Sequence, residues 1–177
     1  MSVHIQVILF KMCPVQHHTM MPVGIFLLLL VSAESFPAHE EDSSTCPEHW
    51  VDATSTGLGC LLFNSTTDYT WEEANNYCQR DENASLVEIL TTLQLDFIRR
   101  ELYGRRGDWW TSGTDLAREG QWYWGPSRLS VADWVWSSEN NEPSGGTYWN
   151  CMMISTDGGY GRSYACIAWY YPICQKK

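Results

Sequence analysis

The sequence predicts an α+β domain that is held together by disulfides. Two segments with helical periodicity lie in the first half of the chain, before about residue 105. From Asp108 onward the sequence changes to short aromatic or apolar runs separated by Gly, Pro, Ser and Asn, which is typical of strands and loops. Helices followed by strands favour an α+β arrangement over a doubly wound parallel sheet.

Residues 1–33 read as a signal peptide. They contain no Asp or Glu, and an apolar run of about a dozen residues begins at Pro22 and ends in small side chains before Glu34. A membrane-spanning helix needs roughly 20 apolar residues, so we expect export without membrane insertion. The segment before the apolar run is long, which makes Met20 and Met21 rival start sites. The sequence therefore predicts a secreted, extracellular protein.

Residues 34–45 are polar and acidic, and they predict a flexible lead-in because they contain too little apolar surface to pack. The folded unit is expected to span residues 46–177. The net charge of −10 argues against nucleic acid as a partner, since phosphate binding needs clustered positive charge. One local cluster of basic residues is interpreted as the solvated end of a helix, where cations complement the dipole: Arg99, Arg100, Arg105 and Arg106.

The first helix is predicted to begin after Thr70. The Thr70 hydroxyl at the N-cap and Glu73 at the third helical position form a capping box, which satisfies two free backbone amides. Four residues recur at helical spacing and therefore share one face: Trp71, Ala74, Tyr77 and Cys78.

The second helix is predicted to begin after Thr91, with Gln94 at the third helical position. Gly104 supplies a stop signal. The expected inward-facing stripe consists of Leu93, Phe97 and Ile98.

Between residues 126 and 150 the sequence shows little periodicity. A loop of that length in a compact domain is usually either functional or a sign that its secondary structure is assigned wrongly. Six cysteines remain after the predicted leader, and an even number in an exported chain indicates three disulfides, although six cysteines allow 15 pairings. A zinc site is the alternative, but the sequence has neither a CxxC pair nor a nearby pair of His ligands.

Several segments in a fixed order resemble the C-type lectin-like domain family in its long form, over about residues 46–175. They are CPEHW (46–50), TWEEANNYCQ (70–79), ASLVEI (84–89), WTSGTD (110–115), EGQWYW (119–124) and YPIC (171–174). The run from 110 to 124 is similar to that of arthropod secreted lectins. The resemblance implies a C-type lectin-like fold of two helices, antiparallel sheets and a long loop region. It also implies the pairings Cys46 with Cys60, Cys78 with Cys174, and Cys151 with Cys166.

The resemblance further implies a ligand-binding loop around NNEPSGG (140–146). In sugar-binding members a calcium ion in this loop bridges the protein and the sugar. Carried over by position, Glu142 is the one retained acidic ligand and Pro143 the cis proline, while Ser144 stands where the family has Asn or Asp. Trp149 replaces a further acid, and Arg162 with Ser163 replaces an Asn-Asp pair.

Calcium binding at this loop is therefore expected to be weak, because calcium affinity follows the number of charged oxygen ligands. Other residues could rebuild a site in a different register: Asn140, Asn141, Asn150 and Asp157. We also hypothesise that the Arg162 guanidinium occupies the vacated cation position and pairs with Glu142. The alternative is a surface arginine that points to water.

Aromatic residues offer a second route to ligand binding. Tyr148 and Trp149 are expected to be exposed, where they could stack on sugars or contact a protein. Four other tryptophans are expected mostly to pack in the core: Trp110, Trp122, Trp124 and Trp134.

Asn64 and Asn83 begin glycosylation sequons. Apart from the leader, the only histidines are His39 and His49, and no nucleophile and base are grouped, so an enzyme is not expected. The sequence thus predicts a secreted glycoprotein that binds a glycan or glycoprotein in innate defence, without a complete calcium site. The alternative is a lectin-fold protein that recognises a protein partner or serves as an extracellular structural component.

Overall fold

The computed structural model describes residues 46–177, so the predicted signal peptide (1–33) and lead-in (34–45) lie outside the described residues. The helices are α1 (Trp71–Arg80) and α2 (Thr92–Leu102). The strands are β1 (Val51–Ala53), β2 (Gly59–Phe63), β3 (Ser85–Leu86), β4 (Trp109–Thr114), β5 (Tyr123–Trp124), β6 (Cys151–Ile154), β7 (Gly161–Tyr164) and β8 (Tyr171–Lys176). Both helices precede β4, as the sequence predicts for an α+β domain.

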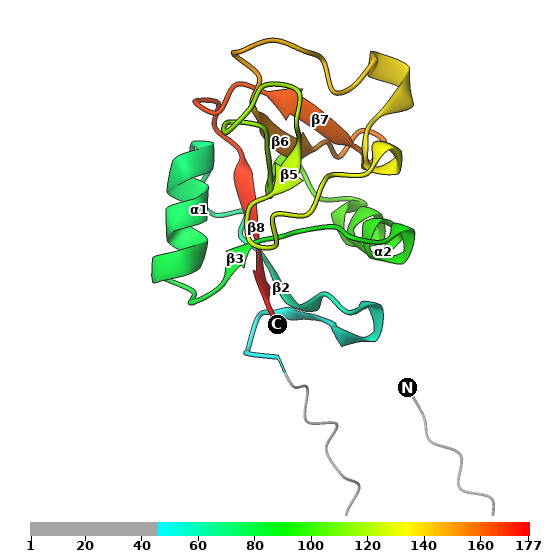
Figure 1. Cartoon of the computed structure of the whole chain (residues 1–177). Coiled ribbons are helices and arrows are strands. Elements are labelled where there is room, and N and C mark those ends of the chain that lie inside the picture. Colours follow the sequence, from blue (N-terminus) through cyan, green and yellow to red (C-terminus); the bar gives the residue numbers. More distant parts are fainter. Residues whose placement is uncertain (1–45) are drawn as a thin grey trace, which may run out of the picture. The chain divides into compact units, whose positions relative to one another are not determined.

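The strands form one mixed sheet in the order β1-β2-β8-β4-β6-β7, with β3 paired to β8 and β5 paired to β4. Every pairing is antiparallel except that of β4 with the last strand, β8. Because β2 and β8 pair along Cys60–Phe63, the first and last parts of the described domain lie together at one end of the sheet. Figure 1 shows this end at the bottom, opposite β6 and β7.

The two helices pack in separate hydrophobic clusters, and Figure 1 shows them on opposite sides of the central strands. Ala74 and Cys78 of α1 belong to one cluster, whereas α2 contributes to the other. Adjacent residues of β4 contribute to the two clusters, because successive side chains of a strand point to opposite faces of the sheet. Trp109 packs with the α2 cluster and Trp110 with the α1 cluster. Strand β4 therefore fixes the two halves of the core to each other.

The helix starts agree with the sequence. The complete capping box of Thr70 and Glu73 opens α1, and the Thr91 hydroxyl accepts a hydrogen bond from the Gln94 amide at the start of α2. The predicted inward stripe of α2 is wrong at Leu93, which is 55% exposed. The apolar face is instead made of Leu95, Ile98 and Leu102, with Phe97 half-buried.

The structure contains three disulfides: Cys46–Cys60, Cys78–Cys174 and Cys151–Cys166, the pairings that the resemblance implies. The second joins the last turn of α1 to the last strand across 96 residues of sequence, and both of its cysteines are fully buried. It therefore ties α1 to the centre of the sheet.

Residues 126–150 form a long loop, as predicted, whose regular structure is limited to two short 3-10 turns at Asp133–Val135 and Ser138–Asn140. Trp136 and Val135 anchor the first part of this loop in the core. Within residues 46–177, neither helix is long and apolar enough to cross a membrane.

Candidate functional site

The long loop turns sharply at Glu142, next to strand β7. The Glu142–Pro143 peptide bond is cis, and Asn141 before it adopts a left-handed conformation with φ of 50°. Asparagine tolerates this conformation better than most residues, because its short polar side chain can bond locally. At this turn the Glu142 side chain lies against Ser163.

The Glu142 carboxylate is the centre of a compact hydrogen-bond network. Its Oε2 atom accepts bonds from the backbone amides of Ser144 and Ser163, each at 2.9 Å, and from the Ser163 hydroxyl at 2.7 Å. The Ser144 hydroxyl lies 2.9 Å from that of Ser163. Hydrogen bonds to an ionised acceptor are roughly twice as strong as neutral ones, so this network fastens the loop to β7.

The hypothesis that Arg162 pairs with Glu142 is wrong. Ser144 and Ser163 supply the donors to that carboxylate, whereas Arg162 forms its ion pair with the exposed Asp157 at 3.9 Å. The backbone amide and the hydroxyl of Ser163 both donate to Oε2 of Glu142, so Ser163 holds this oxygen in place of the guanidinium. The Nε atom of Arg162 is buried and has no hydrogen-bond partner among the described residues.

The residues at the Glu142 position do not fit a calcium site. The one carboxylate is already bound by amides and hydroxyls, and these donors offer a cation hydrogen atoms where it requires oxygen lone pairs. Trp149 and Arg162 supply no oxygen ligands from their side chains. Serine has thus replaced metal as the partner of the retained acid.

A pocket of about 430 Å³ opens beside this network, and we call it the loop pocket. Its polar wall is formed by Glu142, Ser144 and Ser163, and its aromatic wall by Trp149 and Tyr164. The two aromatic rings are stacked, with centroids 6.1 Å apart and planes 15° apart, and their side chains are 44% and 40% exposed. Such a combination of flat apolar faces and convergent polar groups is typical of a small-molecule site.

Tyr170 connects the loop pocket to the core. Its ring lies edge-on to Tyr164 at 5.4 Å and to Trp110 at 4.9 Å. Burial raises the pKa of Tyr170, and the neighbouring Tyr164 and Asp108 raise it further. The hydroxyl therefore stays protonated across physiological pH and can donate a hydrogen bond.

A second group of oxygen atoms lies at the end of β4, where the sequence analysis named Asn150 but missed Asp115. Within residues 46–177, the buried Oδ1 atoms of Asp115 and of Asn150 have no hydrogen-bond partner. The Asp115 amide donates to the Asn150 carbonyl at 3.2 Å, so the two residues are neighbours. Nearby, Glu119 accepts a bond from the Gly146 amide. The signal that could have indicated this group is an aspartate at the end of a fully buried strand.

Burial raises the pKa of Asp115; the Gly120 amide opposes this shift, and the Glu119 carboxylate adds to it. Two buried oxygens without donors, beside a second carboxylate, suit a hard cation with part of its water shell. This group could hold calcium with few protein ligands. The described residues contain no set of three His, Cys, Asp or Glu side chains that could hold a metal ion, so a cation here would have few charged ligands.

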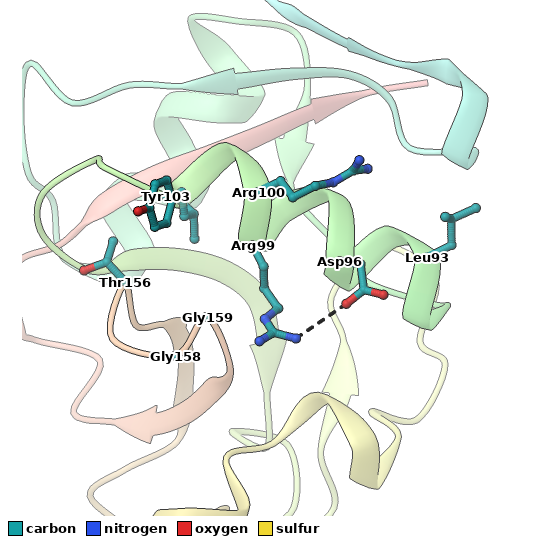
Figure 2. A pocket seen from close by; sticks show the side chains of 9 residues that line it. Leu93, Asp96, Arg99, Arg100, Tyr103, Thr156, Gly158 and Gly159 are labelled. Carbon is teal, nitrogen blue, oxygen red and sulfur yellow. Dashed lines mark hydrogen bonds and ion pairs between the residues drawn. The ribbon is translucent and has the colours of Figure 1, made fainter.

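A pocket of about 820 Å³ lies between α2 and the turn after β6. Figure 2 shows Arg99 directed from α2 toward Asp96, with Gly158 and Gly159 of the turn beside it. Arg99 pairs with Asp96 at 3.5 Å and lies 4.5 Å above the Tyr160 ring. The arginine cluster is thus partly neutralised by its own helix, in agreement with the interpretation as a solvated helix end.

The remaining predicted residues fall into two groups. Trp110, Trp122 and Trp124 are buried and Tyr148 and Trp149 are exposed, as expected, but Trp134 is 36% exposed because it sits on an outer 3-10 turn.

Among the sequons, Asn83 is exposed with φ of 48°. Asn64 accepts a 2.6 Å hydrogen bond from the hydroxyl of Thr66, which belongs to the same sequon. Glycosylation of both asparagines remains a prediction.

The structure is a disulfide-stabilised α+β domain in which a long, anchored loop borders the loop pocket. The profile of the lectin C-type domain matches residues 67–176. The chain belongs to this family.

Relatives of known identity support the assignment. The chain is 29% identical over 138 residues to human C-type mannose receptor 2, and this alignment covers 76% of this chain and 9% of the receptor. It is 30% identical over 146 residues to mouse asialoglycoprotein receptor 2, and this alignment covers 75% of this chain and 42% of the receptor. The chain thus spans less than half the length of either receptor. The solved carbohydrate-recognition domain of mouse scavenger receptor C-type lectin superposes with a TM-score of 0.63 at 25% identity, covering 75% of this chain and 96% of that one.

Proposed function

We propose that the chain is an extracellular lectin that binds a saccharide in the loop pocket without a calcium bridge at Glu142. The observation that carries this proposal is the pair of half-exposed, stacked rings of Trp149 and Tyr164 facing a polar wall. Sugar rings combine C–H faces that pack on aromatic rings with hydroxyls that bond to polar side chains. The names of the mannose receptor, the asialoglycoprotein receptor and the carbohydrate-recognition domain agree with a saccharide ligand.

The Glu142 network has a passive role in this mechanism. It holds the loop against β7 so that Trp149 and Ser144 keep a fixed position around the pocket. A site that is ordered before binding loses less conformational entropy when the ligand enters. The loop is therefore held in place by serine hydrogen bonds, where a calcium-dependent lectin uses the ion.

Replacing Trp149 by Ala should weaken saccharide binding about 30-fold, because truncating an aromatic anchor in a binding site costs about 2 kcal/mol. The measurement is a glycan array on the full secreted chain, run in calcium and in EDTA, followed by titration of the strongest hit. Binding by the wild-type chain should survive EDTA.

The control variant is Tyr103→Ala, which removes a 93% exposed aromatic ring from the end of α2, outside the loop pocket. It should bind as the wild type does. Binding that EDTA abolishes in the wild type and in Asp115→Asn alike would overturn calcium-independent recognition, and an empty array would overturn the proposal in favour of a protein partner. Tyr148, 83% exposed beside the pocket, is the residue that a protein partner would contact first.

We propose a second, supporting function for Asp115 and Asn150, which is to bind a calcium ion that steadies the loop from its other side. At neutral pH the buried, ionised Asp115 costs native stability, because its folded pKa is raised; this cost disappears as the pH falls through that pKa. A bound cation would offset the same cost.

For a dissociation constant of about 1 mM, typical of extracellular modules, 10 mM calcium should stabilise the wild type by about 1.4 kcal/mol. Asp115→Asn should lose this response and should be more stable than the wild type in EDTA at pH 7, a gain that fades toward about pH 4. Chemical denaturation in calcium and in EDTA measures both effects, with Glu139→Ala as the control that keeps the response. An equal response of Asp115→Asn would remove these residues from any calcium site.

A further inference from the structure

A second pocket adjoins the loop pocket, and it has no role so far. It measures about 250 Å³ and is lined by Asp68, Gly107, Asp108, Trp169, Tyr170 and Tyr171. We call it the turn pocket, because Trp169 and Tyr170 end the turn between β7 and β8. Asp108 and Tyr170 line both pockets, so the two hollows share a wall.

The floor of the turn pocket is tightly built. Gly107 has φ of 81°, and a Cβ atom there would lie 2.8 Å from the Tyr171 ring, closer than side-chain atoms approach. Tyr171 itself packs on the buried Trp109 at 5.2 Å. The absence of a side chain at Gly107 therefore keeps the hollow beside Tyr171 open on a rigid base.

The rim of the turn pocket carries an aromatic platform of its own. Trp169 is 58% exposed, more than either ring of the loop pocket. Exposing an indole to water is unfavourable unless a partner covers it, since apolar surface costs about 25 cal/mol per Å² in water. The shared wall thus has one exposed aromatic platform on each side, Trp149 with Tyr164 on one and Trp169 on the other.

The polar groups along the two pockets disfavour an anionic ligand. Three carboxylates line them, Glu142, Asp108 and Asp68, against one guanidinium, Arg162. An anionic sugar would meet net repulsion at these carboxylates. Carboxylates and the Tyr170 hydroxyl are, in contrast, good partners for sugar hydroxyls, which both donate and accept.

We infer that the turn pocket is a second saccharide subsite, so that the two pockets together bind a chain of neutral, β1,4-linked glucose-type units. This inference rests on the proposed function of the loop pocket. Glucose-type rings carry their substituents equatorially, which leaves a flat C–H face to pack on each aromatic platform. Aromatic platforms on both sides of a shared wall suit neighbouring units of one chain better than a single terminal sugar.

The test is an NMR titration of the full chain with glucose, cellobiose, cellotriose and cellotetraose. Affinity should rise at least tenfold from glucose to cellotetraose. In Trp169→Ala this gain should vanish, so that cellotetraose binds no more tightly than glucose does. Ile167→Ala is the matched control, since Ile167 is 80% exposed on the same turn but does not line the pocket, and it should keep the full gain.

The outcomes separate this inference from the proposed function. Glycan binding on the array without any gain along the cello-oligosaccharide series, or a gain that Trp169→Ala retains, overturns the second subsite and leaves the loop pocket standing. An array without binding overturns both. A basic chain is the rival occupant of an acidic aromatic groove, so binding of hexalysine with no saccharide binding would reassign the groove to a protein segment.

Discussion

Replacing both Cys78 and Cys174 by alanine should lower the free energy of unfolding by roughly 4 to 5 kcal/mol. This disulfide closes a loop of 96 residues, and in the chain-entropy model a cross-link of that span removes close to the largest amount of freedom that the unfolded domain can lose. Typical domains are stable by about 5 to 15 kcal/mol, so the melting temperature should fall by roughly 15 °C. Thermal and chemical denaturation measure the loss.

The matched control is the removal of Cys46 and Cys60, whose sequence separation is only 14. The same model gives about 3 kcal/mol for so short a loop. If removing this second disulfide proves as costly as removing the first, local strain or packing rather than chain entropy would govern the stability of the domain. Cys78 and Cys174 are fully buried, so part of any excess would come from the cavity that alanine leaves.

The second large effect is expected at Glu142. Glu142→Ala should destabilise the domain by about 3 kcal/mol, because it leaves the amides of Ser144 and Ser163 and the buried Ser163 hydroxyl without their charged acceptor. Hydrogen exchange should show the loss directly, as faster exchange of the Ser144 and Ser163 amides. Saccharide binding should weaken in parallel, because the loop no longer holds the pocket.

Two further variants test whether the loss of stability is specific to the Glu142 carboxylate. Glu139→Ala removes an exposed carboxylate from the same loop and should change neither stability nor exchange. Glu142→Gln keeps one acceptor oxygen but adds an amide group that can only donate, so its effect should lie between those of the two alanine variants. Equal stability of Glu142→Ala and Glu139→Ala would mean that the network does not fasten the loop.

Much of the fold could be predicted because its signals are local. The capping box at Thr70 and Glu73 needs only four residues of sequence, and it is present as predicted. The inward face of α2 was wrong at Leu93 because that residue lies in the first turn of the helix, where the apolar stripe through Leu95 and Ile98 leaves it on the outer side. Hydrophobic periodicity therefore predicted that a helix is present, but it did not predict which side of the first turn faces the core.

The site was harder to predict because it depends on the register of distant segments. Glu142 and Ser163 are 21 residues apart, and only the pairing of β6 with β7 shows that the serine rather than Arg162 meets the carboxylate. Asp115 was missed for the same reason, since its contact with Asn150 follows from the pairing of β4 with β6. Comparison with the family's calcium ligands showed which of them this sequence lacks. It did not show that Ser144 and Ser163 bind Glu142 instead.

The position of Lys177 relative to the long loop affects how the domain can be attached to a surface. Cys60 pairs with Lys176 at the end of the sheet, and in Figure 1 the long loop lies at the opposite end. A tether attached at Lys177 would therefore hold a domain to a surface with its pockets facing outward. Copies joined in this way on a bead or scaffold would all present the same face, so that weak individual contacts could add up to avidity on a repetitive polysaccharide surface.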